Sequence, residues 1–142
     1  AATSSVPNHI TFTGKVPTEQ LPLWYAAADV FAMPCRTRNA GWDVEGLGIV
    51  YLEASASEVP VIAGDSGGAP DAVLEGETGY VVDGTNTEQI SKTIVRVLTD
   101  AQLAQQLGRR GREWVLTNWT WERAVNRLQA LLAGNDPDDV HL

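Results

Sequence analysis

The sequence predicts an α/β fold, a parallel sheet with flanking helices. Short apolar or β-branched segments alternate along the chain with segments whose apolar residues recur at helical spacing. Two of the short segments, 29–34 (DVFAMP) and 59–64 (VPVIAG), have no polar alternation, which is typical of parallel strands buried on both faces. Strands of an antiparallel sheet with one solvent-exposed face would instead alternate apolar and polar residues.

In the first half of the chain, two strands enclose a helix and precede a long loop. Residues 9–13 (HITFT) are β-branched and aromatic, as in a strand. Residues 19–28 predict a helix that tolerates a proline near its start. The buried strand 29–34 follows, and then a polar loop over 35–46, whose length is often a sign of function in compact domains.

The middle of the chain continues the alternation. Residues 47–57 predict a helix on the basis of length, although their first apolar residues would also suit a strand. The strand 59–64 ends in a glycine-rich turn, and 69–74 predict a short helix with a proline near its start. Residues 78–82 (TGYVV) predict a fourth strand. Four strands make a small sheet for the number of helices that the sequence predicts.

Three helices are expected at the C-terminal end, over 87–100, 101–118 and 120–134. Five of the ten basic residues lie in the last two of these helices: Arg109, Arg110, Arg112, Arg123 and Arg127. We interpret them mainly as a solvated helix face, with contact to phospholipid headgroups as the alternative. We expect residues 1–134 to form the domain and 135–142 an acidic tail.

Composition excludes several classes of protein. The chain has 142 residues, 44% hydrophobic and 20% charged, which suits one ordinary domain. Ten Lys and Arg against eighteen Asp and Glu give a net charge of -8, so we expect no nucleic-acid partner. The single Cys35 excludes an intrachain disulfide framework and fits a reducing compartment. His9 and His141 lie at opposite ends, which argues against a zinc site. No apolar run approaches the roughly 20 residues of a membrane span, and we expect no secretory signal.

The sharpest local feature is the segment 43–53 (DVEGLGIVYLE). Gly46 and Gly48 at a loop-to-helix junction leave backbone N–H groups open, and a helix start favours a negative ligand group such as phosphate. Glu45 precedes the junction and Glu53 lies within the helix, about 12 Å away along its axis. That separation exceeds the roughly 5–9.5 Å of a glycosidase carboxylate pair. It suits two carboxylates that hold hydroxyls at either end of one elongated ligand; the alternative is two solvent-facing glutamates around a packing glycine.

Two common nucleotide-binding motifs are absent from the sequence. There is no GxGxxG after a strand and no P-loop. The turn 64–68 (GDSGG) still follows a buried strand and precedes a helix, which is the usual ligand edge of a parallel sheet. We expect Trp114, Trp119 and Trp121 to pack between helices and Cys35 to be an inert buried thiol.

These motifs carry a family resemblance. The segment 45–54 (EGLGIVYLEA) has the Glu-x7-Glu pattern of the retaining GT-B glycosyltransferases of family 4, and the chain resembles that family from Ile10 to about Leu132. Residues 31–73 are similar to the actinobacterial phosphatidylinositol mannosyltransferases. The resemblance implies an enzyme that moves mannose from GDP-mannose, through an α-1,6 linkage, to a phosphatidylinositol mannoside lipid. It also implies retention of configuration, with no dedicated metal and no cofactor beyond the nucleotide-sugar donor.

The resemblance implies roles for residues that match the motif. Glu45 would be catalytic and hydrogen-bond the donor sugar's hydroxyls beside the reacting centre. The amides of Gly46, Leu47 and Gly48 would face the sugar and the diphosphate, whose stabilisation as a leaving group is the main catalytic demand. Glu53 would bind the ribose hydroxyls.

A second matching turn lies near the start of the chain. Lys15 and Val16, which follow Gly14, match the turn whose backbone meets the nucleobase. The sequence departs from the family at Asp71, where a glutamate is commoner, and in the loop at 39–42, which affects the expected shape of the acceptor loop.

The resemblance also implies missing parts. Family members are longer and have two Rossmann-like domains, and this chain matches the later part of the second, without its first two strands or the Arg and Lys that clamp the diphosphate. In the strand order 3-2-1-4-5-6, that loss removes the centre of the sheet. We therefore expect an incomplete C-terminal GT-B domain, inactive alone, paired with a complementary chain that carries the missing strands. The lipid acceptor would bind through the absent domain, and the enzyme would be cytoplasmic, peripheral at the inner face of the plasma membrane.

Two alternatives remain open from the sequence. Glu-x7-Glu does not select the nucleotide, so a UDP-sugar-dependent family 4 transferase fits as well. A module that binds a nucleotide sugar without chemistry is the alternative outside the enzymes.

Overall fold

The computed structural model of the chain describes residues 6–135, and its centre is a parallel sheet in the order β1-β2-β3. The strands are β1 (Phe31–Met33), β2 (Val61–Gly64) and β3 (Gly79–Val82). All three run parallel, with Val61 opposite Phe31 on one side and Gly79 on the other. The expected parallel α/β fold is confirmed, with three of the four predicted strands.

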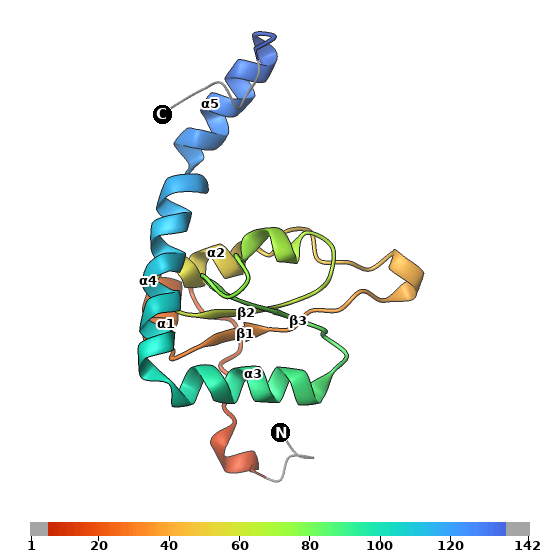
Figure 1. The fold of residues 1–142 in the computed structure, drawn as a ribbon, viewed down its shortest axis with the longest axis vertical. Helices are drawn as coiled ribbons and strands as arrows, with labels where there is room; N and C mark the ends of the chain where they lie inside the picture. The colour runs from red at the N-terminus through yellow and green to blue at the C-terminus, as the bar shows by residue number, and fades with distance from the viewer. Residues whose placement is uncertain (1–5, 136–142) are drawn as a thin grey trace.

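The described part of the chain also contains five α-helices and four short 3-10 helices. The α-helices are α1 (Leu21–Ala26), α2 (Ile49–Ala56), α3 (Thr87–Thr99), α4 (Ala101–Asn118) and α5 (Trp121–Leu132). The 3-10 helices are Pro7–His9, Thr18–Gln20, Asn39–Gly41 and Ala69–Ala72. Helices α2 and α3 lie on opposite faces of the sheet, and α4 stands at one end of it (Figure 1).

The central strand β2 divides the core in two. Val61 and Ala63 point into a cluster with Tyr51 of α2, whereas Ile62 points into a second cluster with Val97 of α3. All four residues of β2 are buried, as the unpatterned apolar run predicts.

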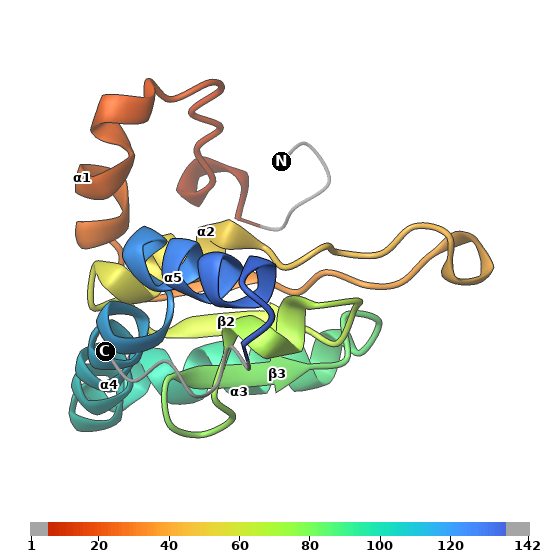
Figure 2. The same ribbon diagram turned by 90° about the horizontal axis from the view of Figure 1, so that it is seen from above.

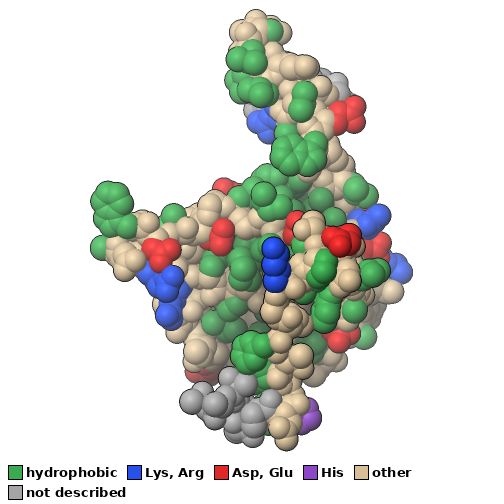
Figure 3. All heavy atoms as spheres, turned by 180° about the vertical axis from the view of Figure 1, so that it is seen from behind, with side chains coloured by type: hydrophobic (Ala, Val, Ile, Leu, Met, Phe, Trp, Pro, Cys, Tyr) green, Lys and Arg blue, Asp and Glu red, His purple; other side chains and the backbone are tan. Residues whose placement is uncertain are grey.

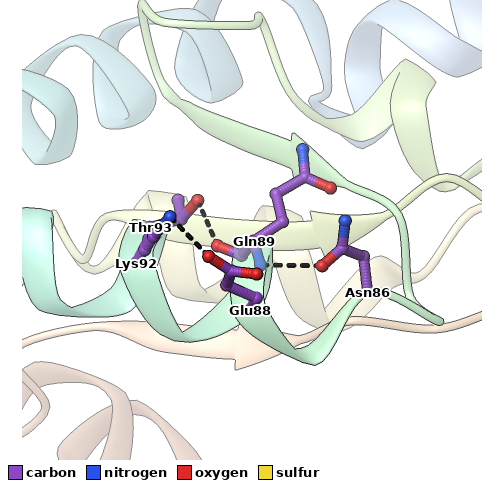
Figure 4. Close-up of polar contacts among 5 residues, drawn as sticks. All are labelled: Asn86, Glu88, Gln89, Lys92 and Thr93. Atoms are coloured by element: carbon purple, nitrogen blue, oxygen red, sulfur yellow. Dashed lines mark hydrogen bonds and ion pairs between the residues drawn. The ribbon is translucent and has the colours of Figure 1, made fainter.

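The start of α3 is fixed by its own side chains (Figure 4). Asn86 accepts a hydrogen bond from the backbone N–H of Gln89 at 3.0 Å and so caps the helix. Lys92 pairs with Glu88 at 2.6 Å, and the Thr93 hydroxyl donates to the Gln89 carbonyl at 2.9 Å. The helix therefore begins at the predicted residue.

Helix α4 packs closely on the C-terminal end of α2 through two glycines. A Cβ at Gly108 would clash with the carbonyl oxygen of Glu58, whereas one at Gly111 would lie 3.3 Å from the Ser55 side chain. Arg112 reinforces the contact, because its guanidinium donates to a carbonyl of α2 and pairs with Glu58 at 3.7 Å. The α2–α4 contact is thus a backbone-to-backbone fit that larger side chains would prevent.

The predicted strand over 9–13 is wrong. Residues 10–13 form no ladder, and Ile10 and Phe12 are 41% and 78% exposed. The physical reason is the strand order: in a doubly wound sheet the third strand pairs with the second and not with the fourth. Among residues 6–135 no strand is placed to pair with it.

The first strand also differs from its prediction. We expected 29–34 to be buried on both faces, but β1 is three residues long, and its middle residue, Ala32, is exposed. It is an edge strand, because within the described residues β2 is its one partner.

The last helix projects away from the sheet and leaves an apolar stripe uncovered (Figures 1 and 3). Its exposed apolar residues are Trp121, Val125, Leu128, Leu131 and Leu132. The expected packing of the tryptophans between helices is wrong for Trp119 and Trp121, which are exposed. The rings of Trp114 and Trp119 meet edge to face at 5.8 Å, but both belong to α4 and its C-terminal cap. No helix within residues 6–135 is long and apolar enough to cross a membrane.

Candidate functional site

A long loop after β1 leads to the candidate site and extends beyond the edge of the sheet (Figures 1 and 2). At its tip Asn39, Ala40 and Gly41 all have positive φ, which turns the chain back sharply. Arg38 and Asp43 close the turn, with an antiparallel bridge between their backbones and an ion pair of 2.8 Å between their side chains. The returning arm then brings Glu45 back to the end of the sheet.

The returning arm rests on the glycine-rich turn after β2. The N–H of Gly68 donates to the carbonyl oxygen of Glu45 at 3.0 Å. A Cβ at Gly67 would clash with that same oxygen, and one at Gly68 would clash with the carbonyl oxygen of Gly46. Both glycines are therefore required so that the two backbones can touch.

Ser66 is the polar centre of this contact. Its side chain is buried at 2% exposure, and its hydroxyl accepts a hydrogen bond from the N–H of Glu45 at 3.3 Å. The same hydroxyl bonds to that of Thr37 at 3.0 Å, so one serine holds both arms of the loop. Sequence reasoning placed the GDSGG turn at the ligand edge but gave Ser66 no role; the buried strand before the turn is the signal that points to it.

The junction between loop and α2 has the form that the sequence predicts. Gly48 is the residue before the helix and adopts a left-handed conformation with φ 73°, and a Cβ there would clash with the ring of Tyr51. The Glu45 carboxylate accepts a hydrogen bond from the N–H of Gly46 at 3.1 Å. A carboxylate thus already lies against one of the amides at the helix start, where negative charge is favoured.

Glu53 lies on the exposed side of α2 and has one partner on another helix. The hydroxyl of Tyr25 in α1 donates to its Oε2 atom at 2.9 Å. Burial, and to a smaller extent the neighbouring Glu53 carboxylate, together raise the pKa of Tyr25 to about 12. Tyr25 therefore remains a neutral donor at physiological pH.

The two glutamates line adjoining hollows at the start of α2. Glu45 faces a hollow of about 470 Å³ that also touches Met33. Glu53 faces one of about 540 Å³ that extends to α5. Leu47 and Ile49 border both, so the two carboxylates lie on either side of one short stretch of chain.

Tyr51 fixes α2 to the end of β1 beneath the site. Its hydroxyl donates to the Met33 carbonyl oxygen at 2.7 Å and lies 3.3 Å from the sulfur of Cys35. Burial raises the pKa of the Tyr51 hydroxyl, and the bond to Cys35 raises it further. Cys35 itself is half-buried, less than expected, with its sulfur 3.6 Å from the carbonyl oxygen of Gly64.

Lys15 and Val16 lie apart from this group on the segment before α1. Lys15 is exposed, Val16 is half-buried, and Gly14 turns the chain with φ 66°. In the part of the chain that the structure describes, no hydrogen bond or ion pair joins them to Glu45 or Glu53.

Comparison with known proteins decides the family. The family model for glycosyl transferases group 1 matches residues 1–114. The chain belongs to this family. The resemblance that the Glu-x7-Glu segment carries is therefore confirmed.

Relatives with known names are similar over nearly the whole chain. The chain is 55% identical over 134 residues to the GDP-mannose-dependent alpha-(1-6)-phosphatidylinositol monomannoside mannosyltransferase of Mycolicibacterium smegmatis, covering 94% of this chain and 35% of that protein. It is 53% identical over 131 residues to the protein of the same name from Mycobacterium tuberculosis H37Rv, covering 92% of this chain and 34% of that one. The chain thus spans about a third of the length of these glycosyltransferases and matches their C-terminal part.

Solved structures agree on the fold. Sucrose-phosphate synthase from Thermosynechococcus elongatus superposes with a TM-score of 0.80 at 32% identity, over 91% of this chain and 31% of that one. The Anabaena protein Alr3699/HepE, solved with UDP and glucose, gives 0.77 at 21% identity, over 91% of this chain and 33% of that one. The expected fold class, the C-terminal domain of a GT-B glycosyltransferase, is confirmed.

Proposed function

We propose that this chain supplies most of the donor site of a retaining mannosyltransferase, which moves mannose from GDP-mannose to a phosphatidylinositol mannoside lipid. The observation that carries the proposal is the 55% identity, over 94% of the chain, with a mycolicibacterial protein named for that activity. Because the chain spans 35% of that protein, the complete activity requires further parts.

Glu45 is the catalytic residue in this proposal. Its backbone is fixed by Ser66 and Gly68, so the side chain projects from a supported position. In the structure its carboxylate accepts a hydrogen bond from the N–H of Gly46. When the donor binds, the negative charge of the ligand would accept that hydrogen bond instead, and the carboxylate would turn toward the sugar hydroxyls.

The start of α2 binds the diphosphate in this proposal. The amides of Gly46, Leu47 and Gly48 precede or open the helix, where the backbone N–H groups lack helical partners. Stabilising a departing diphosphate there lowers the barrier to breaking the sugar–phosphate bond.

The nucleoside end of the donor falls to Glu53 and to the segment before α1. Glu53 holds the ribose hydroxyls through its exposed carboxylate. Lys15 and Val16 contact the base through their backbone, which requires the segment before α1 to lie against the nucleotide.

We further propose that 1–134 is the donor domain, that 135–142 is an acidic tail, and that a complementary chain or segment pairs with the free edge of β1. Residues 136–142 of the tail lie outside the described residues. The supporting observations are the edge position of β1 and the exposed HITFT segment, both of which two further strands would cover. The acceptor lipid would bind through that absent part, at the inner face of the plasma membrane.

Titration of the complete protein with two donors tests the proposal. Ligand that binds the folded state alone stabilises it by about 2.7 kcal/mol at a hundredfold excess over Kd, which raises the unfolding temperature. We expect GDP-mannose to raise it and UDP-glucose to leave it unchanged. Stabilisation by UDP-glucose alone would favour the UDP-sugar transferase, and GDP-mannose binding without transfer would favour the non-catalytic module.

A further inference from the structure

Glu53 is held by a residue that the family motif does not contain. Tyr25 lies on α1, 28 positions before Glu53, and its hydroxyl donates to Oε2 at 2.9 Å. Glutamate side chains on an exposed helix face usually move among several rotamers, whereas this bond selects one.

Tyr25 is itself held by a row of aromatic rings. Its ring meets that of Phe31 edge to face at 5.6 Å, and Phe31 meets Tyr51 in the same way at 6.0 Å. The Tyr51 hydroxyl is bonded to the carbonyl oxygen of Met33 at 2.7 Å. The position of the Tyr25 hydroxyl is therefore set by the sheet and not by a freely rotating side chain.

We propose that Tyr25 is a positioning residue that orients the Glu53 carboxylate toward the vicinal diol of a nucleotide ribose. The inference rests on the function proposed above. A carboxylate offers about four acceptor positions on its two oxygens, so the bond to Tyr25 occupies one and leaves Oε1 wholly available. Two adjacent hydroxyls can then donate to the remaining positions.

The chemistry of the donor fits this role. A neutral phenol donates a hydrogen bond to the carboxylate without bringing a positive charge, so Glu53 keeps its full negative charge for the diol. The phenol is neutral well above physiological pH, because burial and the Glu53 carboxylate together raise the pKa of Tyr25 to about 12. An arginine or lysine in the same place would compete with the ribose for the carboxylate.

The test compares two nucleotides on the complete protein and its Tyr25→Phe variant. GDP carries both ribose hydroxyls, and 2′,3′-dideoxy-GDP carries neither. We expect Tyr25→Phe to weaken GDP binding about three- to tenfold and to leave dideoxy-GDP binding unchanged, which corresponds to about 0.7–1.4 kcal/mol for GDP alone. Equal weakening of both ligands would show a structural role, and no weakening would show no role; either result overturns the proposal.

Two further variants keep the test decisive. Tyr80→Phe removes a hydroxyl from a half-buried tyrosine on β3, under Arg96, and should change neither affinity. In a Glu53→Gln background, Tyr25→Phe should have no additional effect on the ratio of the two affinities. Should Tyr25→Phe fail to fold, Glu53→Gln alone must abolish the discrimination, and a ratio that persists in it overturns the proposal.

The failure of the proposed function has a different signature. Wild-type protein that binds neither nucleotide contradicts the donor-site proposal. If the wild-type protein binds both nucleotides equally, it has a nucleotide site, but Glu53 does not bind the ribose hydroxyls. That result would also overturn the role of Tyr25.

Discussion

The N–H of Glu45 donates a hydrogen bond to the hydroxyl of Ser66 at 3.3 Å, across 21 positions of sequence. The N–H of Gly68 also donates to the carbonyl oxygen of Glu45 at 3.0 Å. The backbone of the candidate catalytic glutamate is therefore held at both its N–H and its carbonyl group. The support comes from the end of β2, the most deeply buried strand. The position of Glu45 therefore depends on the turn that follows that strand.

Replacing Ser66 tests this dependence. Ser66→Ala removes the acceptor for the Glu45 N–H and the partner of Thr37, so we expect a loss of about 1–3 kcal/mol in unfolding free energy. Because the loop would also loosen, transfer should fall in kcat more than in KM. Thr37→Val removes the second bond alone and is the matched control. Wild-type stability and kcat in Ser66→Ala would contradict the role of this bond.

The sequence predicts those parts of the fold that depend on local pattern. The helix over 101–118 has its predicted bounds, and 59–64 contains a buried strand, because periodicity and apolar runs are local properties. The segment 9–13 has strand composition too, but pairing requires a neighbour that local pattern cannot supply.

The candidate site likewise has a part that the sequence predicts and a part that it does not. The glycine junction before α2 is a local motif, and the sequence predicts it. The hydrogen bonds between Glu45 and Ser66 and between Tyr25 and Glu53 join residues 21 and 28 positions apart. Sequence patterns relate residues only a few positions apart, so they do not reveal these contacts.

The contact between α2 and α4 provides a stability test with its own control. Gly108→Ala places a methyl group on the Glu58 carbonyl oxygen and should cost about 1–3 kcal/mol of unfolding free energy, as overpacking does. Gly111→Ala meets Ser55 at 3.3 Å, and the better helix propensity of alanine offsets part of that crowding. Denaturant unfolding of both variants measures the difference. Equal effects at the two positions would contradict the close α2–α4 fit.

The ionisation of Tyr25 gives a prediction about pH. Its folded pKa is raised, chiefly by burial, from 10.0 to about 12, so its stabilising contribution is complete below pH 10 and is lost as the pH rises toward 12. In Glu53→Gln the pKa should fall but stay above 10, because burial remains. Alkaline absorbance titration of wild type minus Tyr25→Phe measures it. Ionisation of Tyr25 near pH 10 in the wild type would contradict the buried, hydrogen-bonded geometry.

The most direct test of the donor-site account is Glu45→Gln in the complete protein. Gln keeps the size of the side chain but removes its charge, so the rate of mannose transfer to a phosphatidylinositol mannoside should fall about a hundredfold or more. GDP binding should stay within about threefold of wild type, since the diphosphate amides are unchanged. Glu88→Gln, at the exposed start of α3 on the other face of the sheet, is the matched control and should transfer normally. Loss of transfer with retained GDP binding is the predicted result, and undiminished transfer by Glu45→Gln would contradict the account.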